Sequence, residues 1–571
     1  MIVTPPAQDH PTIYPSQTFH FSYPTPTTSI VEEMYSDHGG LYGMDDYRLL
    51  YKESVDSPDK SWARQFREFL TFEQVFMKVR EGTPSEGVAW FLVALIYEPD
   101  EPISSTASAL RARGVKKVTA WAVYLPMFPE AVIIFLAISR LGAIHTLIFD
   151  GTAPAVIADR LLGCSSQVIV AVDYTKRGGR ELPMKRLLDE ALRSCPAVHT
   201  VLDRDVRWDD VVDPAAELVQ PESMDSEDPL FIMYPSGSTG KPKGLVRSTA
   251  GFLTGAAVTG KCVIDIRPSD IFCAGDIAWI SGQLVNALYV PLLLGPSRYW
   301  DICEKYNVTQ FYVAPTTVRL LKWLRDSEIP HTHCHRCWYY HAMGKGRAHL
   351  LDTYFQTETG SLVLTPLAGV TPTKPGSCTL PFFGVITSHC PEGILAIRNP
   401  WPGMARSAWG DHQRFVNTYF QAFAGDGACR DEDGYYWLKG RIDDVVNVDA
   451  YRFSIAEIKA AFLENRYTAE AAAVGIIYEE TGQAVVAFAS PKQQLEGRVL
   501  RLGLRSEVSR PISDYALPKA MYLVDITEAC SGKLTRRILQ RILVGERADF
   551  GDTSTVVNPE AIYIVIKTVH G

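Results

Sequence analysis

Short apolar runs alternate with amphipathic stretches in the first half of the chain. Residues 118–125, 144–149 and 167–172 are mostly apolar and have the length of buried strands. Residues 129–141 and 182–194 carry apolar side chains at helical spacing. Strands that alternate with helices are typical of a parallel sheet covered by helices, so the predicted fold class is α/β.

The pattern changes towards the C-terminus. Residues 457–464 and 536–544 have helical spacing, whereas residues 471–477 and 484–488 read as strands. This mixture predicts a small α+β domain that begins near Arg441.

The N-terminal part has two characters. Residues 1–45 are rich in Pro, Ser, Thr and Tyr and poor in aliphatic side chains, so we expect a loosely ordered arm. From about residue 49 the sequence predicts helices, including one over residues 61–79. The predicted domains are the arm (1–45), a large domain (46–440) and a small one (441–571).

Charge and hydropathy exclude two classes of partner. The net charge of −9 argues against a nucleic-acid scaffold, because phosphate backbones need a basic surface. The longest apolar stretch, residues 131–147, contains Ser139, Arg140 and His145, so we expect no membrane span. No signal-peptide profile is present at the start of the sequence, and eleven scattered cysteines suggest reduced thiols; a cytoplasmic enzyme is expected.

The most informative segment is a glycine-rich loop after the apolar strand at residues 230–233. Residues 234–244 read Tyr-Pro-Ser-Gly-Ser-Thr-Gly-Lys-Pro-Lys-Gly. Glycines and small hydroxyl residues let backbone amides curl around an anion, and Lys241 and Lys243 add positive charge. The loop lacks the Gly-Lys-Ser/Thr start of a Walker helix, and the alternative is a flexible Ser/Gly loop.

This loop resembles the signature loop of the adenylate-forming superfamily of acyl-CoA synthetases, peptide-synthetase adenylation domains and luciferases. Further strings at residues 124–131, 224–230, 365–376 and 550–555 resemble the acetyl-CoA synthetase family, with similarity from about residue 51 to about residue 559. The resemblance implies a large N-terminal αβ domain, a small mobile C-terminal domain, and AMP-forming ligation of acetate or another short acid to CoA.

The resemblance also implies which residues bind ATP and Mg2+. The β- and γ-phosphates are assigned to Ser236, Gly237, Ser238, Thr239, Gly240 and Lys241. The nucleotide motif is assigned to Asp352, Thr353, Tyr354, Phe355, Gln356 and Thr357, with Thr357 near the α-phosphate and Glu358 as the Mg2+ ligand. Asp426 is expected to hold the ribose, and Arg441 and Arg452 to bind near the nucleotide.

Three further sites follow from the same resemblance. Lys533 is the expected catalytic lysine of the adenylation step. Arg177, Gly178, Gly179 and Arg180 are expected to hold the nucleotide end of CoA, together with Ser281 among the cofactor contacts. Trp279, Ile280 and Phe355 are expected to line the acid pocket, with acetate the first choice and propionate the second.

The chain also departs from the family pattern. The segment that lines the adenine in the family is replaced by residues 331–337, His-Thr-His-Cys-His-Arg-Cys, whose crowded spacing is poor for a tetrahedral metal site. Pro235, Asp449-Ala450 and Ser509 replace residues expected at the phosphate loop and the CoA tunnel. Two alternatives therefore stay open: a non-catalytic relative with damaged adenine and CoA sites, and an acyl-adenylating enzyme with another acceptor. Neither the acid nor the oligomeric state follows from the sequence.

The assigned role of Lys533 gives a first prediction. The Lys533→Ala variant should lose acid-dependent ATP–pyrophosphate exchange, because the ammonium group stabilises phosphate charge in the adenylation step. The same variant should still convert synthetic acetyl-adenylate and CoA to the thioester at close to the wild-type rate. An equal loss in both half-reactions would contradict the assignment.

Overall fold

The computed structural model describes most of the chain. The described residues are 2–4, 44–69, 76, 78–83, 87–90, 94–95, 101–152, 154–177, 180–198, 200–202, 218–234, 244–264, 271–273, 276–285, 298–313, 349–388, 392–420, 426–441, 445–448, 451–465, 467–478, 482–491, 504, 517–524, 536–546, 550 and 560–571.

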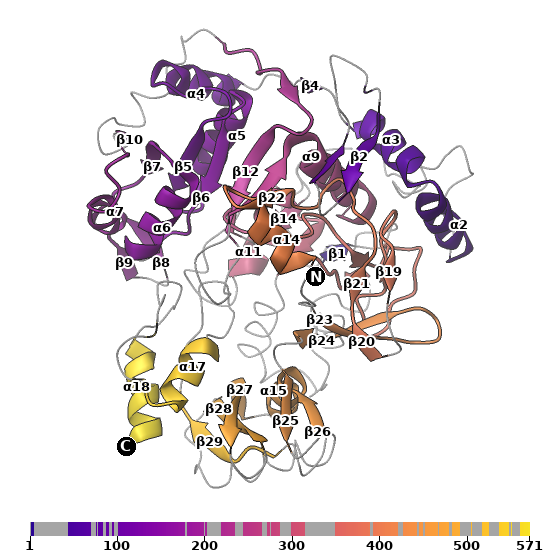
Figure 1. Ribbon diagram of the computed structural model, residues 1–571, viewed down its shortest axis with the longest axis vertical. Helices are drawn as coiled ribbons and strands as arrows, with labels where there is room; N and C mark the ends of the chain where they lie inside the picture. Colours follow the sequence, from indigo (N-terminus) through magenta and orange to yellow (C-terminus); the bar gives the residue numbers. More distant parts are fainter. Residues whose placement is uncertain are drawn as a thin grey trace. The chain divides into compact units, whose positions relative to one another are not determined.

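The chain forms two compact units (Figure 1). Unit 1 comprises Met1–Thr387, Ile397–Gln421 and Asp433–Tyr436. Unit 2 comprises Ser388–Ala396, Ala422–Glu432 and Trp437–Gly571. The domain boundaries expected at residues 46 and 441 stay predictions.

Unit 1 contains a seven-stranded sheet with the order β10-β7-β5-β6-β12-β13-β22. The strands are β10 (Thr200–Leu202), β7 (Val168–Ala171), β5 (Ala120–Tyr124), β6 (Ile144–Leu147), β12 (Pro229–Met233), β13 (Leu245–Ser248) and β22 (Ser407–Ala408). Neighbours from β10 to β12 are parallel, whereas β13 and β22 join in antiparallel pairs. The predicted parallel sheet is confirmed, and two antiparallel strands are added at one edge.

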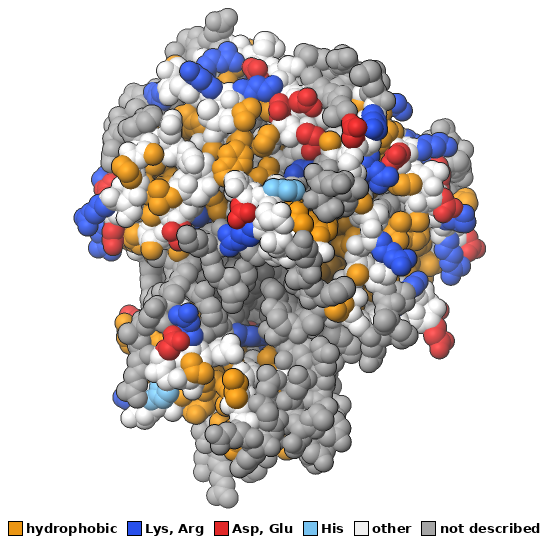
Figure 2. Space-filling view, in the orientation of Figure 1, with side chains coloured by type: hydrophobic (Ala, Val, Ile, Leu, Met, Phe, Trp, Pro, Cys, Tyr) orange, Lys and Arg blue, Asp and Glu red, His pale blue; other side chains and the backbone are white. Residues whose placement is uncertain are grey.

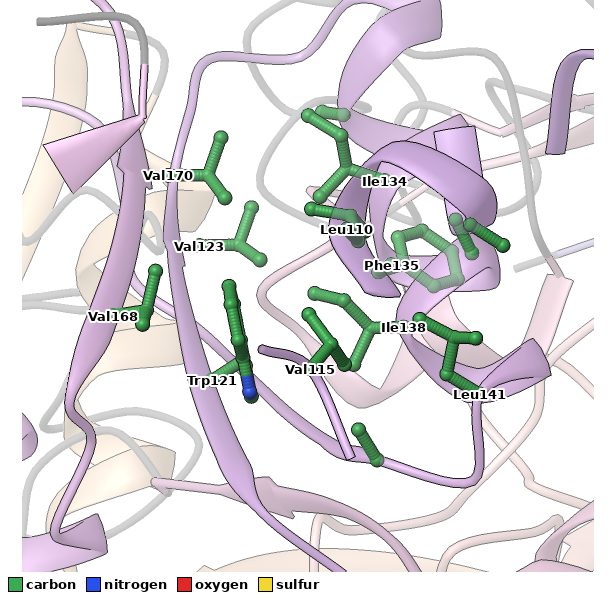
Figure 3. Packing of buried hydrophobic residues seen from close by; sticks show 14 of the residues in the cluster. Leu110, Val115, Trp121, Val123, Ile134, Phe135, Ile138, Leu141, Val168 and Val170 are labelled. Atoms are coloured by element: carbon green, nitrogen blue, oxygen red, sulfur yellow. The ribbon is translucent and has the colours of Figure 1, made fainter. Parts of the chain in front are cut away.

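Helices cover both faces of this sheet. They are α4 (Glu101–Ala112), α5 (Pro129–Arg140), α6 (Pro154–Cys164) and α7 (Met184–Leu192). Trp121 and Val123 of β5 pack against α4 and α5, as Figure 3 shows for α5. Ala122 and Tyr124, the residues between and after them, pack against α6 and α7. Successive side chains of a strand point to opposite faces of the sheet. Because helices cover both faces here, all side chains of a central strand are buried, and the strand is a continuous apolar run.

One prediction near the N-terminus needs correction. The predicted helix over residues 61–79 is α3 (Pro58–Phe69), which follows α2 (Met44–Asp56). The rings of Phe66 and Phe76 lie only 5.5 Å apart, whereas a continuous helix would separate ten residues by about 15 Å. Phe66 and Phe76 therefore do not belong to one continuous helix, and the predicted helix is too long.

Three residues of the expected arm, Ile2–Thr4, are ordered, whereas the arm as a whole stays a prediction. These residues form β1, which pairs with β15 (Gln310–Tyr312) and β16 (His349–Leu351) in a sheet that also contains β14 (Ile271–Cys273). A run of β-branched residues suits a strand, and the rest of residues 1–43 lies outside the described residues.

Shorter elements complete unit 1 and its margins. The strands are β2 (Arg80–Thr83), β3 (Gly87–Trp90), β4 (Ala94–Leu95), β8 (Thr175–Arg177), β9 (Arg180–Leu182), β11 (Met224–Asp225), β17 (Leu364–Thr365), β18 (Leu380–Pro381), β19 (Thr387–Ser388) and β21 (Ala396–Ile397). The helices are α9 (Thr249–Thr259), the π-helix η2 (Gly260–Ile264), α10 (Ile280–Val285), α11 (Arg298–Lys305) and α14 (His412–Tyr419).

Unit 2 is the predicted mixture of helices and strands. Its main sheet has the order β26-β25-β28-β27 with β29 paired to β28, and a second sheet has the order β20-β23-β24. One face of the main sheet packs on α15 and the other on α17 and α18. The elements are β20 (Glu392–Ile394), β23 (Asp426–Arg430), β24 (Tyr436–Arg441), β25 (Val445–Val448), β26 (Tyr451–Ser454), α15 (Ile455–Glu464), β27 (Thr468–Tyr478), β28 (Gly482–Pro491), β29 (Ala520–Leu523), α17 (Arg536–Leu543) and α18 (Glu560–His570).

Charge is mixed on the face drawn in Figure 2, where Lys and Arg side chains are interspersed with Asp and Glu. The described residues on this face therefore form no continuous basic surface for a polyanion. Within the described residues, no helix is both long enough and apolar enough to cross a membrane.

A histidine is buried in the core of unit 1. His145 of β6 is 2% exposed, and its ring lies 5.2 Å from that of Phe135 and 5.3 Å from that of Phe231. Burial lowers the pKa of His145 to about 4, partly opposed by a hydrogen bond with Gln283. The imidazole is therefore neutral in the folded protein at neutral pH.

This histidine makes stability depend on pH. The unfolded chain takes up the proton from about pH 6.5 downward and the folded chain only near pH 4, so stability falls as the pH drops through that window. Between pH 7 and pH 5 the loss should be about 2 kcal/mol. Urea unfolding at both pH values should show this extra loss in the wild type and not in His145→Gln. The exposed His412 supplies the control variant His412→Gln, which should behave as the wild type; an unchanged loss in His145→Gln would refute the prediction.

Candidate active site

The predicted nucleotide motif, residues 352–360, is a loop between β16 and β17 that is closed at its base. Tyr354 forms an antiparallel bridge with Leu364, and its backbone nitrogen donates to the Leu364 carbonyl at 2.8 Å. The backbone nitrogen of Val363 donates to the Tyr354 carbonyl at 2.9 Å. The loop tip is thus presented from a fixed stem.

Hydrogen bonds also fix the tip of the loop. The hydroxyl oxygen of Thr359 accepts from the backbone nitrogen of Gln356 at 2.8 Å. The indole nitrogen of Trp401 donates to the carbonyl of Thr359 at 3.1 Å and to the hydroxyl of Ser361 at 3.0 Å. The loop therefore carries its own internal bracing, and Trp401 ties it to a second segment.

Gly360 is required where this loop meets that second segment. Its φ is +67°, and a Cβ atom there would lie 2.0 Å from the carbonyl oxygen of Gly403 and 2.5 Å from Nη1 of Arg247. Both the left-handed backbone and the close contact exclude any larger residue.

The carboxylate of Glu358 is held at the loop tip. Its Oε1 accepts a hydrogen bond from the hydroxyl of Tyr419, the last residue of α14, at 3.0 Å. The backbone nitrogen of Ala405 donates to the Glu358 carbonyl at 3.0 Å. Burial and the neighbouring Glu358 charge raise the pKa of Tyr419, so Tyr419 remains a neutral donor.

A buried arginine lies beside this carboxylate. Arg247 of β13 is fully buried, and its Nη1 donates to the carbonyl of Gly403 at 2.6 Å. Burial lowers the pKa of Arg247 to about 9, and the charge of Glu358 acts in the opposite direction. At neutral pH the guanidinium is therefore charged and contributes a positive potential at Glu358.

Neither Arg247 nor Tyr419 was predicted from the sequence as part of the site. The one available signal for Arg247 was its position four residues after Lys243, at the end of the glycine-rich loop. Burial of an arginine in a strand cannot be seen from sequence, because arginine is mostly exposed.

The ends of the glycine-rich loop are anchored, although Pro235 and Ser236–Lys241 lie outside the described residues. Met233 of β12 pairs with Leu245 of β13, so the loop joins two neighbouring antiparallel strands. Tyr234 is buried and its hydroxyl donates to the Arg160 carbonyl at 3.3 Å. The loop therefore starts and ends at rigid positions.

The residues assigned to the acid pocket lie in two separate segments of unit 1. Trp279 and Ser281 are half-buried and Ile280 is buried, at the start of α10, whereas Phe355 is half-buried in the nucleotide loop. The ring of Trp279 lies 6.0 Å from that of Phe149, with an edge-to-face angle of 64°. That these residues line one pocket stays a prediction.

Two of the predicted ligand contacts have buried polar atoms that find no hydrogen-bond partner among the described residues. These are the hydroxyl oxygen of Thr353 and the indole nitrogen of Trp279. A buried polar group without a hydrogen bond costs stability, so such atoms are often completed by a ligand.

Other predicted residues lie in unit 2. Asp426 begins β23 and is half-buried, and its carbonyl accepts from the backbone nitrogen of Leu395 at 3.0 Å. Arg441 ends β24 and Arg452 lies in β26, opposite Asn447 of β25. Unit 1 contains Arg177 and Arg180, which pair at the end of the β8–β9 hairpin. Gly178, Gly179, Lys533, the segment 331–337, and residues 449–450 and 509 lie outside the described residues.

Comparison with known proteins identifies the family. The AMP-binding enzyme family model matches residues 98–388, and the AMP-binding enzyme C-terminal domain model matches residues 457–533. The acetyl-coenzyme A synthetase of Penicillium chrysogenum is 43% identical over 99% of this chain and 97% of its own length. The acetyl-coenzyme A synthetase of Emericella nidulans is 45% identical over 93% of this chain and 94% of its own length.

A solved structure has the same fold. The acetoacetyl-CoA synthetase from Streptomyces lividans superposes with a TM-score of 0.81 at 21% identity, covering 95% of this chain and 97% of that chain. The fold agrees with the family that the two family models and the relatives indicate. This chain belongs to the acetyl-coenzyme A synthetase family of AMP-binding enzymes.

Proposed function

We propose that the chain uses ATP to activate acetate, or another short-chain carboxylic acid, to an acyl-adenylate and then to the acyl-CoA thioester. Relatives named acetyl-coenzyme A synthetase align with 99% and 93% of the chain. The observation that carries the proposal is that Thr353 and Trp279, both predicted ligand contacts, have buried polar atoms with no hydrogen-bond partner in the described part of the chain. A nucleotide and a carboxylate can supply the missing partners.

The proposed chemistry has two steps. A carboxylate oxygen attacks the α-phosphorus of ATP, and the bond from that phosphorus to pyrophosphate breaks. The CoA thiolate then attacks the acyl carbon, and AMP leaves. Because charge develops on phosphate oxygens in the first step, the loop amides of Ser236–Lys241, together with Thr357 and the Lys533 ammonium, are suited to stabilise it.

Glu358 fits the role of a Mg2+ ligand. Among the described residues, no group of three or more His, Cys, Asp or Glu forms a metal cage. In nucleotide-dependent enzymes Mg2+ is usually held by one or two carboxylates and by substrate phosphates, so a single Glu358 suffices. Tyr419 donates to Oε1, and Oε2 has no hydrogen-bond partner within the described part of the chain. A cation bound there would neutralise phosphate charge.

The remaining assignments concern orientation of the substrates. We assign the ribose to Asp426, and contacts near the nucleotide to Arg441 and Arg452. Arg177, Gly178, Gly179 and Arg180, with Ser281, are assigned to CoA. Trp279, Ile280 and Phe355 are assigned to the acid; their mostly apolar side chains suit a short alkyl group.

A second candidate function is favoured by the length of the alignments. The alignment with the Penicillium relative spans 661 positions, whereas this chain has 571 residues, so the relative has segments without a counterpart here. Loss of segments around the adenine and CoA sites would leave a protein that adenylates an acid without using CoA, or one that binds nucleotide without catalysis.

We also propose a cytoplasmic location. The support is the number of scattered cysteines in the sequence, of which Cys164 and Cys195 are free and buried. A fluorescent fusion expressed in a fungal cell tests this: diffuse fluorescence is expected, and enrichment in one organelle would contradict it.

Pyrophosphate release separates the candidate functions. Purified protein should release pyrophosphate from ATP with acetate, less with propionate and least with butyrate, and CoA should increase turnover by at least about tenfold. Turnover that is indifferent to CoA would support another acceptor. Absence of release with every acid would refute the proposed activity.

The hydrogen bond to Glu358 gives a graded prediction. Glu358→Gln should lower acid-dependent ATP–pyrophosphate exchange by roughly 100-fold or more, because a neutral amide is a poor Mg2+ ligand. Tyr419→Phe should lower it by about tenfold, the cost of one hydrogen bond to a charged group. Tyr435→Phe removes a 2.8 Å hydrogen bond from a buried tyrosine to the Pro372 carbonyl and serves as the control. Equal losses in the two tyrosine variants would indicate a general effect of destabilisation.

A further inference from the structure

A chain of hydrogen bonds leads from the core of unit 1 to the segment assigned to the acid pocket. The hydroxyl of Ser139 on α5 lies 3.3 Å from Nδ1 of His145 on β6. Nε2 of His145 lies 3.1 Å from Oε1 of Gln283 on α10. Nε2 of Gln283 donates to the carbonyl of Ile277 at 2.9 Å. Three elements of the fold are thus connected to the residues just before Trp279.

The direction of each hydrogen bond in this series can be deduced by starting from the Ile277 carbonyl. Since the Ile277 carbonyl can only accept, the amide nitrogen of Gln283 faces Ile277 and its amide oxygen faces the imidazole. The Gln283 oxygen also only accepts, so the proton of the neutral ring lies on Nε2 of His145. Nδ1 is left as an acceptor that faces the Ser139 hydroxyl; the single proton of this hydroxyl is shared between Nδ1 and the Phe135 carbonyl, to which the hydroxyl donates at 2.9 Å.

Gln283 holds the turn that carries Trp279 and Ile280. Its backbone nitrogen donates to the Trp279 carbonyl at 3.1 Å, while its side chain reaches Ile277 on the other side of the turn. A carboxylate oxygen of Asp276 accepts from the backbone nitrogen of Ala278 at 2.8 Å. The turn is therefore fixed from both ends.

Packing leaves this turn little room to move. A Cβ atom on Gly282 would lie 2.1 Å from the carbonyl oxygen of Asp276, so the backbone closes tightly on itself. Ile277 is 2% exposed and belongs to the core cluster drawn in part in Figure 3. Displacement of Gln283 should therefore move Trp279 and Ile280 as one unit.

We propose that Gln283 and His145 are positioning residues that set the depth of the acid pocket, by fixing the wall formed by Trp279 and Ile280. The inference rests on the proposed function, in which Trp279 and Ile280 face the alkyl group of the acid. A pocket wall that is held by buried hydrogen bonds can discriminate between acids that differ by one methylene. A short pocket excludes the longer acid only if its wall keeps its position when that acid enters.

Gln283→Met tests the proposal, because methionine has a similar length and neither a donor nor an acceptor. We expect the KM for acetate to rise about tenfold, and the kcat/KM ratio of acetate to propionate to fall by at least fivefold. The KM for ATP should stay within about twofold of the wild type. His145→Phe should produce the same change in selectivity.

The double variant His145→Phe/Gln283→Met shows whether the two residues act as one unit. Its loss of selectivity should be no larger than that of either single variant, because removal of one partner already interrupts the series of hydrogen bonds from Ser139 to Ile277. Gln283→Glu keeps the side-chain oxygen that faces His145 and replaces the amide nitrogen that donates to Ile277 with a second oxygen. It should change selectivity in the same direction. This variant provides a second test if Gln283→Met does not fold.

A matched control removes a buried hydrogen bond elsewhere in unit 1. Ser104 on α4 is fully buried and its hydroxyl donates to the Val219 carbonyl at 3.1 Å, so Ser104→Ala should leave the acid selectivity unchanged. Wild-type selectivity in all Gln283 and His145 variants, in an active enzyme, would overturn the positioning role alone. A wild-type protein with no acid-dependent turnover would instead overturn the proposed function, and the inference with it.

Discussion

The close approach of two backbone segments at Gly360 and Gly403 is the constraint on which the rest of the site depends. A Cβ atom at Gly360 would lie 2.0 Å from the Gly403 carbonyl, and the positive φ of Gly360 turns the loop back on itself. This contact brings the Glu358 loop against the segment that carries Trp401 and Ala405, both of which donate hydrogen bonds to the loop. A larger side chain at Gly360 would separate the two segments and change the position of the Glu358 carboxylate.

The same contact buries a positive charge. Arg247 lies under the Gly360–Gly403 crossing and makes one hydrogen bond, to the Gly403 carbonyl, while Nε and Nη2 have no partner among the described residues. Burial of an arginine costs several kcal/mol unless a carboxylate or carbonyl compensates. The nearby charge of Glu358 provides part of the compensation, so the stability of the crossing and the charge state of Glu358 are coupled. Binding of a cation by Glu358 would therefore weaken the electrostatic compensation of the Arg247 charge.

Sequence reasoning succeeded where the pattern was local. The apolar runs of β5, β6 and β7 and the helical spacing of residues 129–141 predicted a parallel sheet, and the unit 2 strands were predicted by the same rule. Three features could not be predicted from local patterns: the pairing of Ile2–Thr4 with strands more than 300 residues away, the contact between the rings of Phe66 and Phe76, and the burial of Arg247. At the candidate site, the assignment of Glu358 and its loop came from the resemblance to the family and stays a prediction. The donor from Tyr419, 61 residues away, and the His145–Gln283 link, 138 residues apart, depend on how the chain folds back on itself.

The central claim is that a carboxylate oxygen attacks the α-phosphorus of ATP at this loop. Transfer of oxygen from acetate labelled with 18O tests it most directly, because that oxygen stays on the phosphate when AMP leaves. After turnover with ATP and CoA, mass spectrometry should find one 18O atom in AMP and none in pyrophosphate. Unlabelled AMP, or label found only in inorganic phosphate alongside ADP, would contradict the adenylate route.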